Sequence, residues 1–74
     1  MHEYDWVELI VEEEKYTKYG VHKGAVGCVI FDDSYDNKWD IAFVKPDGSG
    51  EDLAEICVAR EDFIIIEHAN IHNK

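Results

Sequence analysis

The 74-residue sequence has only two cysteines, one proline and seven basic side chains, and it contains no long uninterrupted apolar run. A membrane-spanning helix needs about 20 consecutive apolar residues, so no span is predicted. The sequence begins with Met-His-Glu-Tyr-Asp, which is acidic, so we expect no signal peptide and a cytoplasmic protein. Cys28 and Cys57 lack CxxC spacing. We interpret them as two free, mostly buried thiols, with a disulfide between adjacent strands as the alternative.

Seventeen acidic residues against seven basic ones give a formal net charge of −10. Nucleic acids and anionic membranes repel such a surface, so neither is expected as a direct partner. A basic protein partner is expected, with fast, salt-sensitive association. The alternative is that the charge only keeps the protein soluble. Since 46% of the residues are hydrophobic, the chain is expected to fold, as one domain over residues 1–67 with a polar tail over 68–74.

Alternation of apolar and polar residues predicts five short β-strands, over residues 5–11, 25–31, 38–45, 52–59 and 63–67. The clearest alternation is in the third, where Trp39, Ile41 and Phe43 share one face. The fourth breaks period two near Ala54, which predicts a late start or a bulge there.

Residues 25–31 are expected to form the central strand. Gly27 interrupts their β-branched run, and a glycine in such a run usually marks a bulge, or a bend where another backbone comes close. A small sheet needs such a bend to curl onto itself.

The connections have recognisable turn chemistry. Residues 12–24 form a long loop with a helical turn at most, because Gly20 and Gly24 punctuate it. Pro46–Gly50 predicts a tight hairpin, and Arg60–Asp62 a short 3-10 turn. This layout predicts a mostly-β protein, a five-stranded SH3-like small barrel. The alternatives are a β-sandwich fragment, or a three-stranded sheet with one helix over 12–19.

Four segments carry a resemblance to a known family: Asp5–Leu9, Lys23–Val29, Ile41–Gly48 and Ile56–Val58. They resemble small bacterial domains of unknown function with SH3-like topology, and the KOW type uses similar motifs. The hallmark is a Lys-Gly-x-x-Gly-x-Val entry into the second strand, followed by a hairpin. The chain departs from that pattern in its longer first loop and its Asp32-Asp33 pair. The resemblance implies no catalytic residues.

Acidic and tyrosine side chains gather in the first two loops, which an SH3-like barrel would place beside each other at one rim. Exposed tyrosine is enriched at interfaces, and acid suits a partner's Lys and Arg. The alternatives are that the rings of the first loop lie back on the barrel and that the rim is merely solvated. The predicted partner-binding residues are Glu12, Glu13, Glu14, Tyr16, Tyr19, Asp32, Asp33, Tyr35 and Asp36.

Metal and catalytic sites are not predicted. His68 and His72 have helical spacing, but helix formation is weak in this segment and no third ligand lies nearby in the sequence. The acidic run from Asp32 lacks the glycine and the glutamate that a calcium-binding EF-hand loop requires. His22 is near Cys28 in sequence, but a buried thiol is inert unless its pKa is lowered.

The sequence therefore predicts a non-enzymatic acidic protein-binding module without cofactor. One concrete form is an immunity or antitoxin-type inhibitor that masks a basic surface of a nuclease toxin. The alternative is a structural accessory domain, possible as a homodimer, that self-associates through the apolar side chains of Trp6, Ile10, Ile64 and Ile66. A third class is an enzyme that uses Cys28 or a histidine pair.

Overall fold

The computed structural model describes residues 4–31 and 35–67. Predictions for Asp32, Asp33 and the tail over 68–74 lie outside these residues. The elements in chain order are β1 (Trp6–Leu9), α1 (Glu14–Thr17), β2 (Val26–Val29), β3 (Lys38–Val44), β4 (Asp52–Ala59), the 3-10 helix η1 (Arg60–Asp62) and β5 (Phe63–Glu67).

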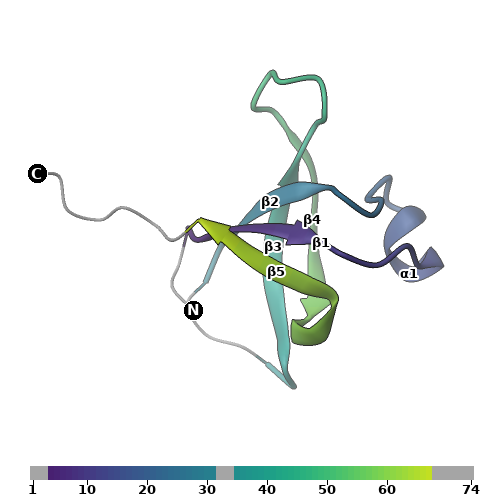
Figure 1. Cartoon of the computed structure of the whole chain (residues 1–74), viewed down its shortest axis with the longest axis vertical. Helices are drawn as coiled ribbons and strands as arrows, with labels where there is room; N and C mark the ends of the chain where they lie inside the picture. The colour runs from purple at the N-terminus through teal and green to yellow at the C-terminus, as the bar shows by residue number, and fades with distance from the viewer. Residues whose placement is uncertain (1–3, 32–34, 68–74) are drawn as a thin grey trace, which may run out of the picture.

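The five strands form one antiparallel sheet in the order β4-β3-β2-β1-β5. The predicted mostly-β architecture is confirmed, with the 3-10 turn directly before the last strand. The strand pairing does not close, so β4 and β5 are the edges of the sheet. In Figure 1, β1 and β5 run across the direction of β3 and β4, and β2 turns between the two pairs.

The core lies on the concave side of this bent sheet. Val7 and Leu9 on β1 and Ile41 and Phe43 on β3 are fully buried, as their alternation predicts. The remaining buried apolar side chains are Tyr16, Val21, Val29, Val58 and Phe63, with Trp39, Leu53, Ile56 and Ile65 among those packed against them.

Gly27 sits in the middle strand but carries no bulge, because it pairs regularly with Val7 and with Phe43. The two register shifts lie instead in the edge strands. Ile66 is the extra residue on β5, next to the residue opposite Val7, and Leu53 is the extra residue on β4, next to the residue opposite Phe43. The predicted irregularity near Ala54 is thus confirmed. Of the two roles predicted for Gly27, the bulge is wrong, and the close approach of another backbone is the one observed. A Cβ at Gly27 would lie 2.7 Å from the carbonyl oxygen of Ala42.

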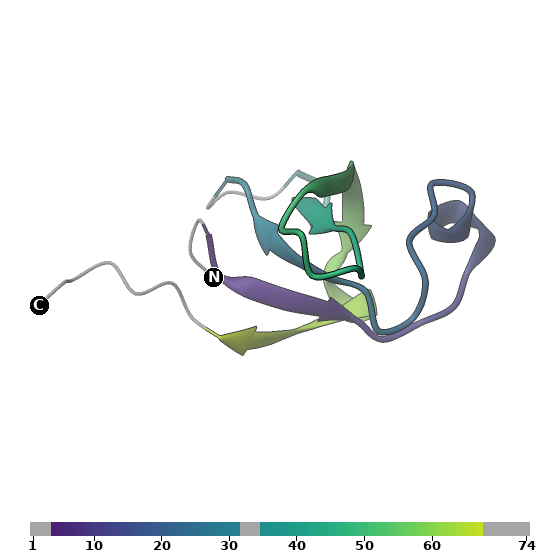
Figure 2. The ribbon, with the colours of Figure 1, turned by 90° about the horizontal axis from the view of Figure 1, so that it is seen from above.

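The long first connection, residues 10–25, is called here the α1 loop. It contains one helical turn and projects from one end of β1 and β2 (Figures 1 and 2). At its base the amide of Gly24 donates to the carbonyl of Leu9, and the amide of Leu9 donates to the carbonyl of Ala25. No helix in residues 4–31 and 35–67 has the length and apolar character to cross a membrane.

Candidate functional site

Tyr16 fixes the α1 loop to the body of the protein. Only 3% of its surface is exposed. Its hydroxyl donates a hydrogen bond to Asp62 Oδ2 at 2.5 Å and accepts one from the amide of Ala59 at 3.3 Å. The predicted role of Tyr16 as a partner contact is therefore wrong. Its ring lies back on the protein, which was the alternative that the sequence left open.

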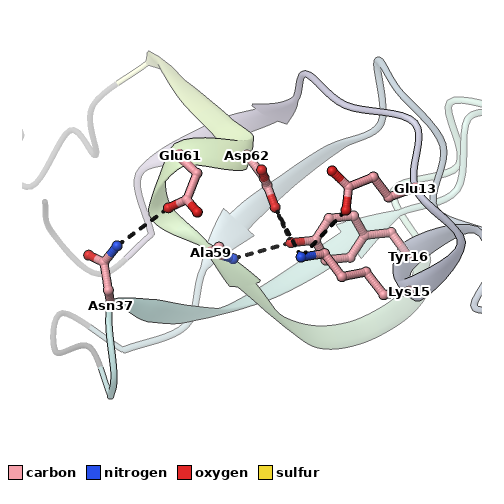
Figure 3. A network of polar contacts seen from close by, with 7 residues as sticks. All are labelled: Glu13, Lys15, Tyr16, Asn37, Ala59, Glu61 and Asp62. Atoms are coloured by element: carbon pink, nitrogen blue, oxygen red, sulfur yellow. Dashed lines mark hydrogen bonds and ion pairs between the residues drawn. The ribbon is translucent and has the colours of Figure 1, made fainter.

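Asp62 is the acceptor at the centre of this contact, and its residue is 6% exposed. A buried carboxylate is costly unless it is paired and hydrogen-bonded. Besides the hydroxyl of Tyr16, Lys15 Nζ lies 3.6 Å from Asp62 and 3.5 Å from Glu13 (Figure 3). Burial, followed by the hydrogen bond to Asp62, raises the pKa of Tyr16, so the phenol stays a donor at neutral pH.

Glu12 is used within the α1 loop itself. Its carboxylate lies 2.7 Å from His22 Nδ1 and accepts the amide of Lys23, also at 2.7 Å. Hydrogen bonding from His22 is the main reason that the pKa of Glu12 is lowered. Glu12 therefore clamps the two ends of the loop together, a role that its place in an acidic triplet did not reveal.

The exposed residues of the predicted set are Glu12, Glu13, Glu14, Tyr19, Tyr35 and Asp36, and among them Glu12 is engaged by His22 and Lys23. Tyr19 is 51% exposed and Tyr35 86% exposed. These are the members of the predicted set that a partner can reach in the described part of the chain.

The second of the two predicted loops contributes a tight hairpin. Tyr35 and Lys38 exchange backbone hydrogen bonds around Asp36 and Asn37, both of which have positive φ. This conformation is that of a two-residue type I′ turn, which favours Asp and Asn. The carbonyl of Asn37 accepts the amide of Arg60, so the hairpin rests on η1.

The 3-10 helix η1 thus contacts both loops, one on each side. In Figure 3, Asn37 lies 3.5 Å from Glu61 on one flank, while Tyr16 reaches Asp62 on the other. The two loops therefore meet at the same turn, which itself carries the exposed carboxylate of Glu61.

A groove of about 380 Å³ lies beside the α1 loop and was not predicted. It holds three of the seven basic residues of the chain, Lys15, Lys18 and Lys38. Lys15 and Lys18 are close because they are three positions apart on one helical turn. Lys38 is close to them only because of the arrangement of the sheet. The other lining residues are Tyr16, Tyr19, Glu55, Ile56, Cys57 and Ala59.

A second hollow of about 500 Å³ lies between the α1 loop and the β3–β4 hairpin. Its lining includes the apolar side chains of Val26, Val44 and Leu53 and the basic side chains of Lys23 and Lys45. Lys45 is paired with Glu51 at 2.9 Å.

Cys28 and Cys57 are both free thiols, as predicted, but only Cys28 is partly buried. Cys57 is exposed, which corrects the prediction, because it lies on the outer face of edge strand β4. Its Sγ lies 2.9 Å from Asp40 Oδ1, and this hydrogen bond raises its pKa; burial raises the pKa of Cys28. Neither thiol is therefore activated as a nucleophile.

Within residues 4–31 and 35–67, no group of three or more His, Cys, Asp or Glu side chains is arranged to hold a metal ion. The histidine pair of the tail lies outside these ranges.

Comparison of the chain with protein-family models, with curated proteins and with solved structures gives no match. The resemblance to small bacterial SH3-like domains therefore stays a prediction.

Proposed function

We propose that the protein is a non-enzymatic module that binds a basic surface of another protein through the exposed acids and tyrosines of the α1 loop and the 35–38 hairpin. The observation that carries this proposal is the anchoring of the acidic α1 loop by buried Tyr16 in a chain of net charge −10. A loop that is already ordered loses less conformational entropy on binding than a flexible one.

Three features support the choice of a basic protein partner. Glu14 and Asp36 are exposed and form no ion pair within the described residues, so both carboxylates are available. Tyr19 and Tyr35 offer large ring surfaces beside these acids, a composition that suits contact with Lys and Arg. The surface that a nuclease uses to hold nucleic acid is basic, so an immunity or antitoxin-type inhibitor of a nuclease toxin is the concrete form we favour.

We also propose that the sheet has an SH3-like topology. The strand order, with β1 between β2 and β5, and the position of η1 before β5 support an SH3-like topology. On this view the protein is a bacterial SH3-like domain whose two loops beside η1 serve as the binding surface.

The test is affinity capture from a lysate of the native host at low and at high salt, read by mass spectrometry. The bait is compared with a double variant, Glu13→Lys with Glu14→Lys, and with a control double variant, Glu51→Lys with Asp52→Lys. Both variants have the same net charge, so only the position of the reversal differs. We expect one basic protein to be retained at low salt by the wild type and by the control, and lost by the α1-loop variant.

Equal retention by both variants would contradict the use of the α1 loop. Loss by both would show that total charge alone drives the contact. As a second readout, Tyr35→Ala removes an 86% exposed ring without touching the core and should weaken capture.

A specific observation favours a second function, self-association. Ile10, Ile64 and Ile66 are 37%, 45% and 46% exposed, and all three lie at or beside the β1–β5 pair. Sedimentation at increasing concentration separates the two functions. A monomer at high concentration removes self-association, and a dimer that Ile64→Thr abolishes supports it.

A further inference from the structure

Strand β4 is an edge of the sheet, since it pairs with β3 alone among the described strands. Two hydrogen bonds outside the ladder show which of its backbone groups face outward. The amide of Arg60 donates to the carbonyl of Asn37, toward β3, whereas the amide of Ala59 donates to the hydroxyl of Tyr16, away from β3.

The same alternation continues along the strand, because backbone groups in an antiparallel pair point toward and away from the partner in turn. Ala59, Cys57 and Glu55 are opposite Lys38, Asp40 and Ala42, respectively. The carbonyl of Asp40, opposite Cys57, accepts a hydrogen bond from the amide of Ile30 on the side of β3 that faces away from β4. The backbone groups of this residue pair therefore do not bond to each other, in agreement with the alternation. The N–H and C=O groups of Cys57 and Glu55 therefore face the free edge.

The groove of about 380 Å³ runs beside this edge. One wall is β4 itself, from Glu55 to Ala59, and the other is the α1 loop with Lys18 and Tyr19. At one end the hydroxyl of Tyr16 already satisfies the outward amide of Ala59, so this hydroxyl limits how far an added strand can extend.

The lining of the groove contains three lysines and one acid, Glu55. Lys15 is neutralised by Glu13 and Asp62. Lys18 and Lys38 form no ion pair within residues 4–31 and 35–67, and the amine of Lys18 lies over the ring of Tyr19 at 5.3 Å. Two lysines beside a row of outward backbone groups match an extended chain with carboxylate side chains.

We propose that the β4 edge at Glu55–Cys57 binds an extended, acidic segment of another polypeptide by β-strand addition. Backbone hydrogen bonds to Cys57 and Glu55 would hold the segment, and Lys18 and Lys38 would select its acidic side chains. The groove shares Tyr19 with the surface of the proposed function but contains none of that surface's acids, so the inference does not rest on the proposed function. A second copy of the chain is disfavoured as the occupant of this edge, because Lys18, Lys38 and Glu55 would each approach the like charges of the other copy.

The test is NMR titration of the isotope-labelled full chain with a capped peptide, acetyl-Thr-Val-Glu-Val-Glu-Val-Thr-amide, and with the same peptide carrying Lys in place of Glu. With the acidic peptide we expect amide shifts at residues 55–57 and slower hydrogen exchange of the Cys57 amide. The Lys peptide should bind about fivefold more weakly, because its ammonium groups would face Lys18 and Lys38. No shift at 55–57 with about 1 mM acidic peptide, or equal binding of both peptides, would overturn the proposal.

Variants separate backbone pairing from charge. Cys57→Pro removes the outward amide without removing a β3–β4 hydrogen bond, and Cys57→Ala keeps that amide. Binding should be lost in the first and kept in the second, with the amide spectrum in the remaining strands confirming that both fold. Lys18→Gln with Lys38→Gln should weaken binding, whereas Lys23→Gln with Lys45→Gln, outside the groove, should not.

Unchanged binding in Cys57→Pro would exclude strand addition. If Cys57→Pro does not fold, the wild-type titration and the paired lysine variants still test whether the acidic peptide binds at the β4 edge. Shifts at 55–57 that grow with protein concentration in the absence of peptide would identify a second copy as the occupant and overturn the proposal.

Discussion

The hydroxyl of Tyr16 donates a hydrogen bond to Asp62, 46 positions further along the chain. This contact ties the α1 loop to η1, the turn that links β4 to β5. The same hydroxyl covers the outward amide of Ala59 on an edge strand. One side chain thus orders the acidic loop and closes one end of the basic groove.

Replacement of Tyr16 by Phe should destabilise the protein by about 1–3 kcal/mol, because Asp62 and the amide of Ala59 both lose a hydrogen-bond partner in a buried setting. Urea unfolding measures the change. The control is Tyr19→Phe, which alters a 51% exposed ring and should stay within about 0.5 kcal/mol of the wild type. Equal effects of the two substitutions would show that the Tyr16 hydroxyl contributes nothing specific.

The stabilisation by Tyr16 should disappear at alkaline pH. Its pKa in the folded protein is raised above the ordinary value of 10.0, chiefly by burial. A raised pKa means that the folded state holds the proton more tightly. The contribution is therefore fully present below about pH 10 and is lost as pH rises from there through the folded-state pKa. The difference in unfolding free energy between wild type and Tyr16→Phe should be constant near neutrality and shrink above pH 10. A difference that stays constant to the highest pH at which the protein folds would refute this.

Gly27→Ala should destabilise the protein by about 1–3 kcal/mol or more, as overpacking does. The added Cβ would lie 2.7 Å from the carbonyl oxygen of Ala42 and 2.9 Å from Cα of Phe43, and backbone atoms cannot rotate away. Thermal and urea unfolding measure the loss. A variant as stable as the wild type would mean that β2 and β3 separate without cost, which the burial of Phe43 argues against.

Asp40→Asn should make Cys57 react severalfold faster with iodoacetamide at neutral pH. The hydrogen bond to the Asp40 carboxylate raises the pKa of this thiol and so keeps it protonated. Only the thiolate reacts, so removal of the negative charge increases the reactive fraction. Mass spectrometry of timed samples reports each cysteine separately. Cys28 serves as the internal reference and should not change.

The sequence by itself determined the β architecture. Alternation placed Val7, Leu9, Ile41 and Phe43 in the core, and all four are fully buried. Local chemistry predicted the 3-10 turn at Arg60–Asp62. These features follow from residue order because side-chain direction in a strand and the conformation of a turn depend on near neighbours.

The tertiary structure alone decided how these elements meet. The sequence marked Gly27 as special, but the register placed the bulges on β4 and β5, beside its two pairing partners. Tyr16 looked like a surface ring until the fold brought Asp62 to it. Cys57 resembled a buried thiol until the sheet left β4 as an edge. The physical reason is common to all three: burial and pairing depend on contacts between residues far apart in sequence, which local patterns do not encode.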